Sequence, residues 1–154
     1  MKNYINIETK EIYAYESDGS QDEFIKEDLV AISDEDLAIL RTPTARQLLA
    51  QLATARKAQE RQGITLNDIR YAGDPGNRQA LQEAIAFMED ADLTEFPKWK
   101  DSDGVFHQNN PLADVKDAAR AIGARRSQLI AAEGEYAAQI IAGTLTDLTE
   151  VVWP

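Results

Sequence analysis

Apolar and polar positions alternate along residues 3–15 in a way that predicts a β-hairpin at the start of the chain. Two apolar runs flank a polar turn at residues 8–11, and short runs of this kind are typical of strands. The side chains concerned are Tyr4, Ile5, Ile7, Ile12, Tyr13 and Tyr15. After a polar loop at residues 16–20, a second apolar group is predicted to return to the same core: Phe24, Ile25, Leu29, Val30 and Ile32.

Two helices are predicted next. Residues 33–36 have the Ser-x-x-acid spacing of a capping box, which favours a helix start. Pro43 must end that helix, because proline disfavours helical geometry in the residue before it. Residues 44–62 then carry leucines at helical spacing, up to Gly63, a typical C-terminal stop. We expect this longer helix to connect an acidic N-terminal lobe, residues 1–43, to the rest of the chain.

Beyond Gly63 the pattern predicts a small hairpin and a third helix. The hairpin, residues 64–71, alternates around Asn67-Asp68, a pair that tolerates the positive φ of a tight turn. The helix, residues 76–90, follows Asp74-Pro75, which suit the N-cap and the first helical position.

A second hairpin is predicted for residues 96–107, with the polar residues and late glycine of a tight turn at its tip, residues 101–104. A lone two-stranded hairpin is marginal in water. We therefore expect Trp99 to pack this hairpin against the helices on either side. Contact with a partner protein is the other role open to Trp99.

The longest predicted helix, residues 111–142, starts at Asn110-Pro111, another N-cap and proline pair, and ends at Gly143. Its apolar stripe is narrow, so the packing comes from this chain or from another copy, which makes self-association through this helix a candidate. The stripe comprises Leu112, Val115, Ala118, Ile122, Leu129, Tyr136 and Ile140. Residues 144–147 resemble a further cap before one last turn, and Trp153 is either docked on the core or offered to a partner.

Together these elements predict an α+β protein. It has a small N-terminal β-hairpin lobe (1–43), a connecting helix (44–62) and a helical C-terminal domain with two β-hairpins (63–154). The 154 residues, 44% hydrophobic and 28% charged, are typical of a soluble globular protein. We expect neither a membrane span nor a signal peptide, which makes the cytoplasm the expected compartment.

Candidate catalytic chemistry is sparse. The chain has no cysteine and one histidine, His107, which excludes disulfides, thiolate metal sites and a histidine-rich metal site; we expect His107 at the surface. Residues 101–104 begin like a calcium loop, but glycine comes two positions early and no Glu stands at the twelfth position. Residues 73–76 lack the Gly-Lys-Thr/Ser of a phosphate loop. We therefore expect no enzyme, no cofactor and no bound metal.

The formal net charge of −11 argues against DNA or RNA as a partner, because a phosphate backbone would be repelled. Residues 1–40 hold eleven Asp or Glu against three Lys, a net charge of −8. Such a run is either a solvated face or a surface that meets a basic partner and keeps assemblies soluble.

Several short motifs together carry a family resemblance. They are Trp99-Lys100-x-x-Asp103-Gly104-Val105, then Gly63-Ile64 with Ile69, Tyr71, Asp74 and Arg78, and Ile140-Ile141-Ala142-Gly143-Thr144. These motifs resemble a phage domain of unknown function that often forms the C-terminal half of tail-fibre-assembly-like proteins. Ile32–Leu37 and Arg41-Thr42-Pro43 are similar to the segment before the connecting helix of such proteins, with Thr42 where Asn is more usual.

The resemblance implies a non-enzymatic chaperone that binds the C-terminal tip of a trimeric phage tail-fibre protein and assists its folding or trimerisation. It would act in the bacterial host cytoplasm during phage assembly and, as in some relatives, remain on the virion fibre. Two other functions stay open: a structural tail or virion component, and a small acidic regulatory protein. Aromatic side chains dominate protein interfaces, so the candidate partner-binding residues are Tyr13, Tyr15, Tyr71, Trp99, Phe106 and Trp153.

Overall fold

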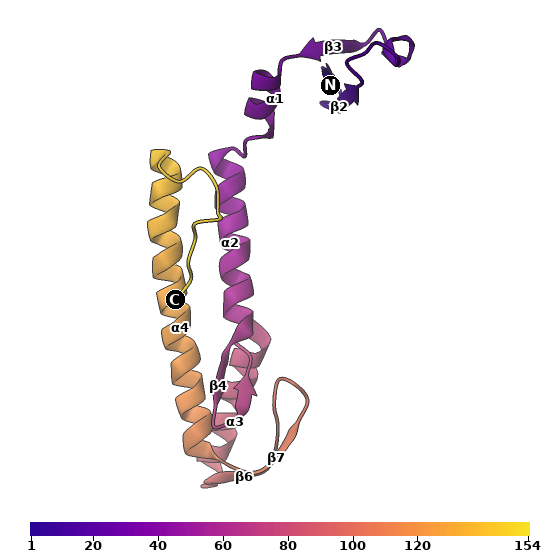
Figure 1. The fold of residues 1–154 in the computed structure, drawn as a ribbon. Coiled ribbons are helices and arrows are strands. Elements are labelled where there is room, and N and C mark those ends of the chain that lie inside the picture. The colour runs from indigo at the N-terminus through magenta and orange to yellow at the C-terminus, as the bar shows by residue number, and fades with distance from the viewer. The chain divides into compact units, whose positions relative to one another are not determined.

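The computed structural model describes residues 1–154 and divides the chain into two compact units, Met1–Thr44 and Ala45–Pro154 (Figure 1). Both units combine helices with small antiparallel sheets, so the α+β prediction is confirmed. The predicted connecting helix lies within the second unit, where it packs against the long helix near the C-terminus.

The first unit is built on a three-stranded antiparallel sheet of order β2-β1-β3, in which β1 is Lys2–Asn6, β2 is Ile12–Tyr15 and β3 is Leu29–Ile32. The predicted hairpin is β1–β2, with Tyr4 opposite Tyr13. The third strand comes from the second apolar group and places Ala31 opposite Tyr4. A 3₁₀ turn, η1 (Asp22–Phe24), lies between β2 and β3.

The second apolar group enters the core only in part. Leu29 is buried, but Phe24 is 62% and Val30 48% exposed, so the expectation that both return to a core is wrong. In a strand, neighbouring side chains point to opposite faces, and a sheet of this size cannot cover both. After β3, Ser33 caps α1 (Asp34–Arg41) by accepting the Asp36 N–H at 3.0 Å, as the capping box predicts.

The second unit is a helical hairpin in which α2 (Ala45–Gln62) and α4 (Leu112–Ala142) run antiparallel, side by side (Figure 1). Near the open end, Leu48 and Leu52 of α2 pack against Ile140 and Leu145. Gly143 adopts the left-handed conformation, with φ +74°, that ends α4 as predicted. None of the helices combines the length and the apolar character needed to cross a bilayer.

The other end of the hairpin carries the smaller elements: β4 (Ile64–Leu66), β5 (Ile69–Tyr71), α3 (Pro75–Asp90), β6 (Glu95–Lys100) and β7 (Phe106–Pro111). Both predicted hairpins form, with positive φ at Asn67 and Asp68 in the first turn. Asp74 caps α3 through the Gly76 and Asn77 N–H groups. The shared core consists of Ile69, Tyr71, Leu81, Val115, Ala118 and Ile122, with Trp99 packed against it.

One sequence prediction at the start of α4 is wrong. The N-cap position is Pro111, without a side-chain cap, whereas Asn110 belongs to β7 and is only 2% exposed. Strand pairing with Phe96 and a hydrogen bond to Tyr71 hold Asn110 in the sheet instead. After Gly143, the prediction of a cap before one last turn is confirmed: the Asp147 carboxylate accepts the Thr149 N–H at 2.8 Å, and the Val151 N–H donates to the Leu148 carbonyl at 3.2 Å.

Two glycines allow the end of α2 to lie against the segment after β5. A Cβ at Gly63 would stand 1.9 Å from the Tyr71 carbonyl oxygen, and Gly63 also has φ +65°. A Cβ at Gly73 would stand 2.1 Å from the Glu60 carbonyl oxygen. Any other residue would push these two backbone segments apart.

We predict that Gly73→Ala destabilises the protein by the upper end of the roughly 1–3 kcal/mol that overpacking costs, because the new methyl meets backbone that cannot rotate away. Gly134→Ala in α4 is the matched control, since nothing lies within 4 Å of its Cβ position. That control should gain about 0.5–1 kcal/mol, since alanine loses less backbone entropy in a helix. Chemical denaturation measures both values, and equal stability of the two variants would contradict the close-approach argument.

Candidate protein-binding surfaces

Tyr71 and Trp99, two of the candidate contact residues, belong to the core of the second unit. Their ring centroids are 5.9 Å apart, and Phe96 stands edge-on to Trp99 at 4.9 Å. Tyr71 is 2% exposed and its hydroxyl accepts a hydrogen bond from Asn110 Nδ2 at 3.1 Å. Burial raises the pKa of Tyr71. Trp99 therefore packs its hairpin against the helices, as predicted, and remains half-buried, whereas Tyr71 is fully buried.

The tip of this hairpin is fastened to strand β5. The Ser102 N–H donates to the Arg70 carbonyl at 3.0 Å, and Ser102 Oγ accepts the Ala72 N–H at 2.7 Å. Asp103 forms an ion pair with Arg70 at 2.5 Å. The polar residues that predict a tight turn also join one hairpin to the other.

Asp101 and His107 form a hydrogen-bonded pair at the base of the tip. His107 Nε2 lies 2.8 Å from Asp101 Oδ2, while Asp101 Oδ1 accepts the N–H groups of Asp103 and Val105. The bond to His107, followed by the backbone bonds, lowers the pKa of Asp101. His107 is half-buried in this pair rather than a free surface residue, which corrects the expectation for it.

Phe106 lies on the outer face of the same hairpin and is 61% exposed. Lys100 is its cross-strand partner, and the Lys98 and Lys100 ammonium groups lie 5.9 and 5.6 Å from its ring centroid. Ammonium groups at this distance interact with an aromatic face. The result is a small cationic–aromatic surface on an otherwise acidic chain.

Trp153 is docked on the helical hairpin. Its ring stands edge-on to Tyr136 of α4 at 6.2 Å. The Tyr136 hydroxyl accepts the Val152 N–H and donates to the Val152 carbonyl, both at 3.1 Å. Arg125 Nη1 donates to the Pro154 carbonyl at 3.0 Å. Of the two roles left open for Trp153, the structure shows the docked one.

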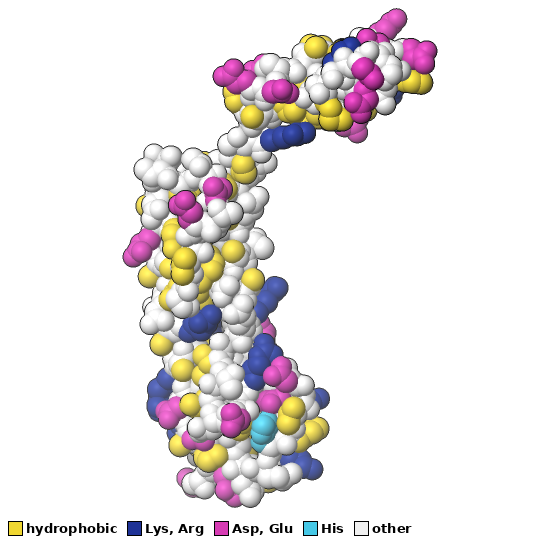
Figure 2. All heavy atoms as spheres, viewed as in Figure 1, with side chains coloured by type: hydrophobic (Ala, Val, Ile, Leu, Met, Phe, Trp, Pro, Cys, Tyr) yellow, Lys and Arg dark blue, Asp and Glu magenta, His cyan; other side chains and the backbone are white.

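Tyr13 and Tyr15 lie on β2 in the first unit, both half-buried. The Tyr15 ring stands edge-on to Tyr4 at 5.6 Å, and its hydroxyl donates to the Phe24 carbonyl. The Tyr13 hydroxyl donates to Glu11 at 2.7 Å, and this bond raises the pKa of Tyr13. Figure 2 shows many acidic side chains on the visible face of this unit.

The six candidate residues thus belong to different parts of their units. Tyr13 and Tyr15 lie on strand β2 of the first unit. In the second unit Tyr71 and Trp99 pack in a hairpin core, Phe106 lies on an exposed hairpin face, and Trp153 belongs to the docked tail.

Lys98 and Lys100 were not among the candidates. A turn confined to residues 101–104 would place Lys100 opposite Val105, so the sequence signal misses this pair by one residue. In the structure Lys100 lies opposite Phe106, and Lys98, two residues away, shares that face. A cavity of about 270 Å³ lies beside Trp99, lined also by Leu81, Lys100 and Ser102.

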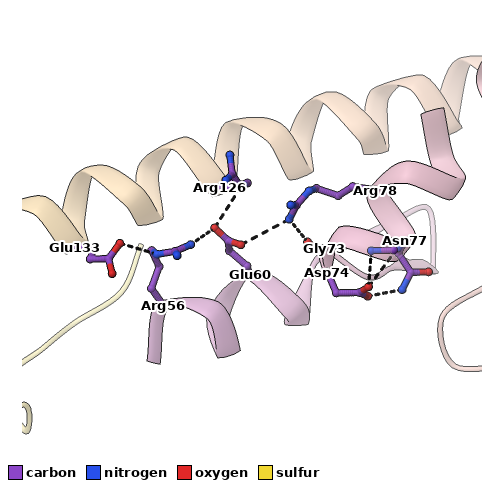
Figure 3. A network of polar contacts seen from close by, with 9 residues as sticks. Arg56, Glu60, Gly73, Asp74, Asn77, Arg78, Arg126 and Glu133 are labelled. Atoms are coloured by element: carbon purple, nitrogen blue, oxygen red, sulfur yellow. Dashed lines mark hydrogen bonds and ion pairs between the residues drawn. The ribbon is translucent and has the colours of Figure 1, made fainter. Parts of the chain in front are cut away.

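A buried network of ion pairs gathers around Glu60, which is 9% exposed (Figure 3). Arg56 pairs with its Oε1, Arg126 Nε lies 3.4 Å from Oε1, and Arg78 Nη1 lies 3.6 Å from Oε2. Arg78 also donates to the Gly73 carbonyl at 2.6 Å. Arg56 Nε lies 2.6 Å from Glu133, close enough for an ion pair but not aligned as a hydrogen bond.

These contacts assign structural tasks to most of the motif residues that suggested a family. Gly63 permits the close backbone approach, Tyr71 fills the core, Asp74 caps α3 and Arg78 joins the Glu60 network. Trp99 packs its hairpin on that core. No three His, Asp or Glu side chains converge as a metal site would require.

Fold and contacts define a two-unit α+β protein: one unit is a small acidic sheet with a short helix, and the other is an antiparallel helix pair that carries two β-hairpins. The chain belongs to the family described as Domain of unknown function (DUF4376), whose model matches residues 43–152. The match covers the second unit almost completely and stops short of the sheet in the first. No curated protein and no solved structure matches the chain.

We predict opposite outcomes for two aromatic truncations on the same hairpin. Trp99→Ala should lower the free energy of unfolding by about 3–5 kcal/mol, because it removes a ring from the core. Phe106→Ala should cost no more than about 1 kcal/mol, since it loses exposed area and weak cation–π contacts. Denaturant unfolding of both variants measures the difference; a stable Trp99→Ala protein would show that the ring does not hold the hairpin.

We also predict that the contribution of Asp101 to stability depends on pH. Its folded-state pKa lies below the ordinary value of 3.8, so the contribution is complete above that value and is lost as pH falls through the lower, folded-state pKa. The stability gap between the wild type and Asp101→Asn should therefore shrink on acidification below about pH 4. Thermal unfolding from pH 6 to pH 2.5 measures the gap, and a constant gap would contradict the assignment.

Proposed function

We propose that this protein is a phage tail-fibre assembly chaperone that works by protein binding alone. The observation that carries the proposal is the number of large apolar side chains left exposed on the small, acidic first unit. Exposed apolar side chains that lie together favour contact with a partner protein, and Ile12 and Val30 share one face of the sheet, since both lie opposite Ile5. The exposed side chains are Ile7, Ile12, Phe24, Val30, Ile39 and Leu40.

The physical properties of the first unit suit a partner that is still assembling. Fibre subunits present unpaired strands and apolar surface before they trimerise, and such surface aggregates readily. The exposed apolar groups can cover it, while the eleven acidic residues among residues 1–40 keep the complex soluble. The Phe106 surface, with Lys98 and Lys100, offers a second contact region of opposite charge.

The resemblance of the chain to tail-fibre-assembly-like proteins supports the choice of partner. The family match covers the second unit, whereas half of the exposed large apolar residues lie in the first. The proposed division is a helical scaffold that carries an acidic binding unit. The expected place of action is the host cytoplasm during phage assembly, with retention on the finished fibre as a later state.

A structural tail or virion component is the second candidate, and helix α4 favours it. Ile130 and Ile141 are 41% and 74% exposed on this helix, which gives it an apolar surface for another copy. Self-association of the purified protein together with its presence in virions, without any effect on fibre folding, would favour this candidate.

The chaperone proposal predicts that co-expression raises the yield of trimeric, soluble fibre encoded beside this gene, and that the two proteins elute together in gel filtration. Phe24→Ser should weaken that complex, because it removes an exposed apolar contact of the first unit. Phe87→Ser on α3 is the matched control, since the two phenylalanines are 62% and 64% exposed.

Fibre yield, trimer content and co-elution are the three readouts. Unchanged trimerisation without this protein, together with separate elution, would reject the chaperone function. If Phe24→Ser and Phe87→Ser weaken the complex equally, binding does not reside in the first unit.

A further inference from the structure

Strand β2 has an outer edge with unpaired backbone groups. The Asn6 N–H donates to the Glu11 carbonyl at 2.9 Å, which fixes which residues of the hairpin face each other through hydrogen bonds. By alternation from that pair, Tyr13 and Tyr15 direct their backbone groups inward, toward β1. Ile12 and Ala14 therefore direct their N–H and C=O groups outward, where no hydrogen bond reaches them.

The opposite edge of the sheet is less open. In β3 the residues that face outward are Leu29 and Ala31, because Val30 and Ile32 pair with β1. The Leu29 N–H already donates to the Lys26 carbonyl at 3.1 Å, and the chain turns into capped helix α1 after Ile32. On β3 only Ala31 therefore has both its N–H and its C=O free and directed outward. On β2 two residues, Ile12 and Ala14, do.

Strand β2 itself contains none of the features that usually prevent an edge strand from pairing with another chain. Natural edge strands are usually protected by lysine, proline, a bulge or a covering segment, but the strand reads Ile12-Tyr13-Ala14-Tyr15. Ile12 and Ala14 are exposed. Four exposed acidic residues, Glu8, Glu11, Glu16 and Asp18, flank the strand, against one exposed lysine, Lys10, in the turn before it, so the surrounding charge is acidic on balance.

We propose that the outer edge of β2 is a strand-addition site, and that its occupant is an extended segment of the fibre subunit that alternates apolar with Lys or Arg residues. This inference rests on the proposed function for the identity of the partner. The apolar side chains would lie beside Ile12 and Ala14, which share one face of the sheet. The basic ones would lie on the other face, beside Tyr13 and Glu11.

Two features select this occupant. Main-chain hydrogen bonds to Ile12 and Ala14 provide affinity for any extended segment, and side chains provide the specificity. A net charge of −8 over residues 1–40 favours a basic strand and repels an acidic one, including a second copy of this unit. Binding should therefore weaken as ionic strength rises.

The test replaces the same residue type on each edge. Ala14→Pro removes an outward N–H from β2, whereas Ala31→Pro removes one from β3. Proline is tolerated at edge positions whose N–H faces solvent, so both variants should fold. Ala14→Pro should weaken the complex with the fibre about tenfold or more, from one lost hydrogen bond and the bulk of the ring. Ala31→Pro should bind like the wild type.

Hydrogen–deuterium exchange of the unmodified protein gives a second, independent readout. The Ile12 and Ala14 amides should exchange fast in the free protein and slowly in the fibre complex, while the Ala31 amide does not change. Full binding by a folded Ala14→Pro protein, or unprotected Ile12 and Ala14 amides in the complex, would overturn strand addition at β2. Absence of any complex with the wild-type protein would instead reject the proposed function itself.

Discussion

The second unit depends on one close approach, between the end of α2 and the segment that follows β5. Gly63 and Gly73 let the two backbones lie against each other, and the Glu60 carboxylate at the same place gathers the guanidinium groups of three arginines. A buried carboxylate is stable only if it is paired. Because Arg78 comes from α3 and Arg126 from α4, satisfying Glu60 also positions both helices.

The positions of the two hairpins depend on this close approach of α2 to the segment after β5. Once β5 is held beside α2, Tyr71 reaches the apolar side of α4, and Trp99 packs over it with Phe96. Ser102 and Asp103 then fasten the hairpin tip back to Ala72 and Arg70. The motif residues thus define a scaffold, which is why membership of the family describes the fold of the second unit and leaves its binding partner to be proposed.

Local signals in the sequence predicted much of this fold. Asn67-Asp68 and Asp74-Pro75 predicted a turn and a cap correctly, because their chemistry acts over a few residues. The same kind of signal failed at Asn110, where contact with distant Tyr71 decides the outcome. Within the Glu60 network only the Arg56–Glu60 pair, four residues apart on α2, has a local signal. Arg78 and Arg126 lie on other helices and reach Glu60 only after folding. Val30 was misplaced because hydrophobicity alone does not say which face of a small sheet is covered. Phe24 lies in η1, outside the sheet, where no strand pairing directs its side chain to a core.

The charge of the first unit explains how an open strand edge can exist without pairing between copies of the chain. Two copies that met edge to edge along β2 would bring Glu8, Glu11, Glu16 and Asp18 of one copy against those of the other, and like charges across paired strands are destabilising. A basic segment meets the opposite situation, with attraction over about the 8–10 Å Debye length at physiological salt. The acidic residues therefore select which strands can pair with β2, and they do not block its edge. They exclude self-pairing and leave the hydrogen-bonding groups of Ile12 and Ala14 accessible to a partner of the opposite charge.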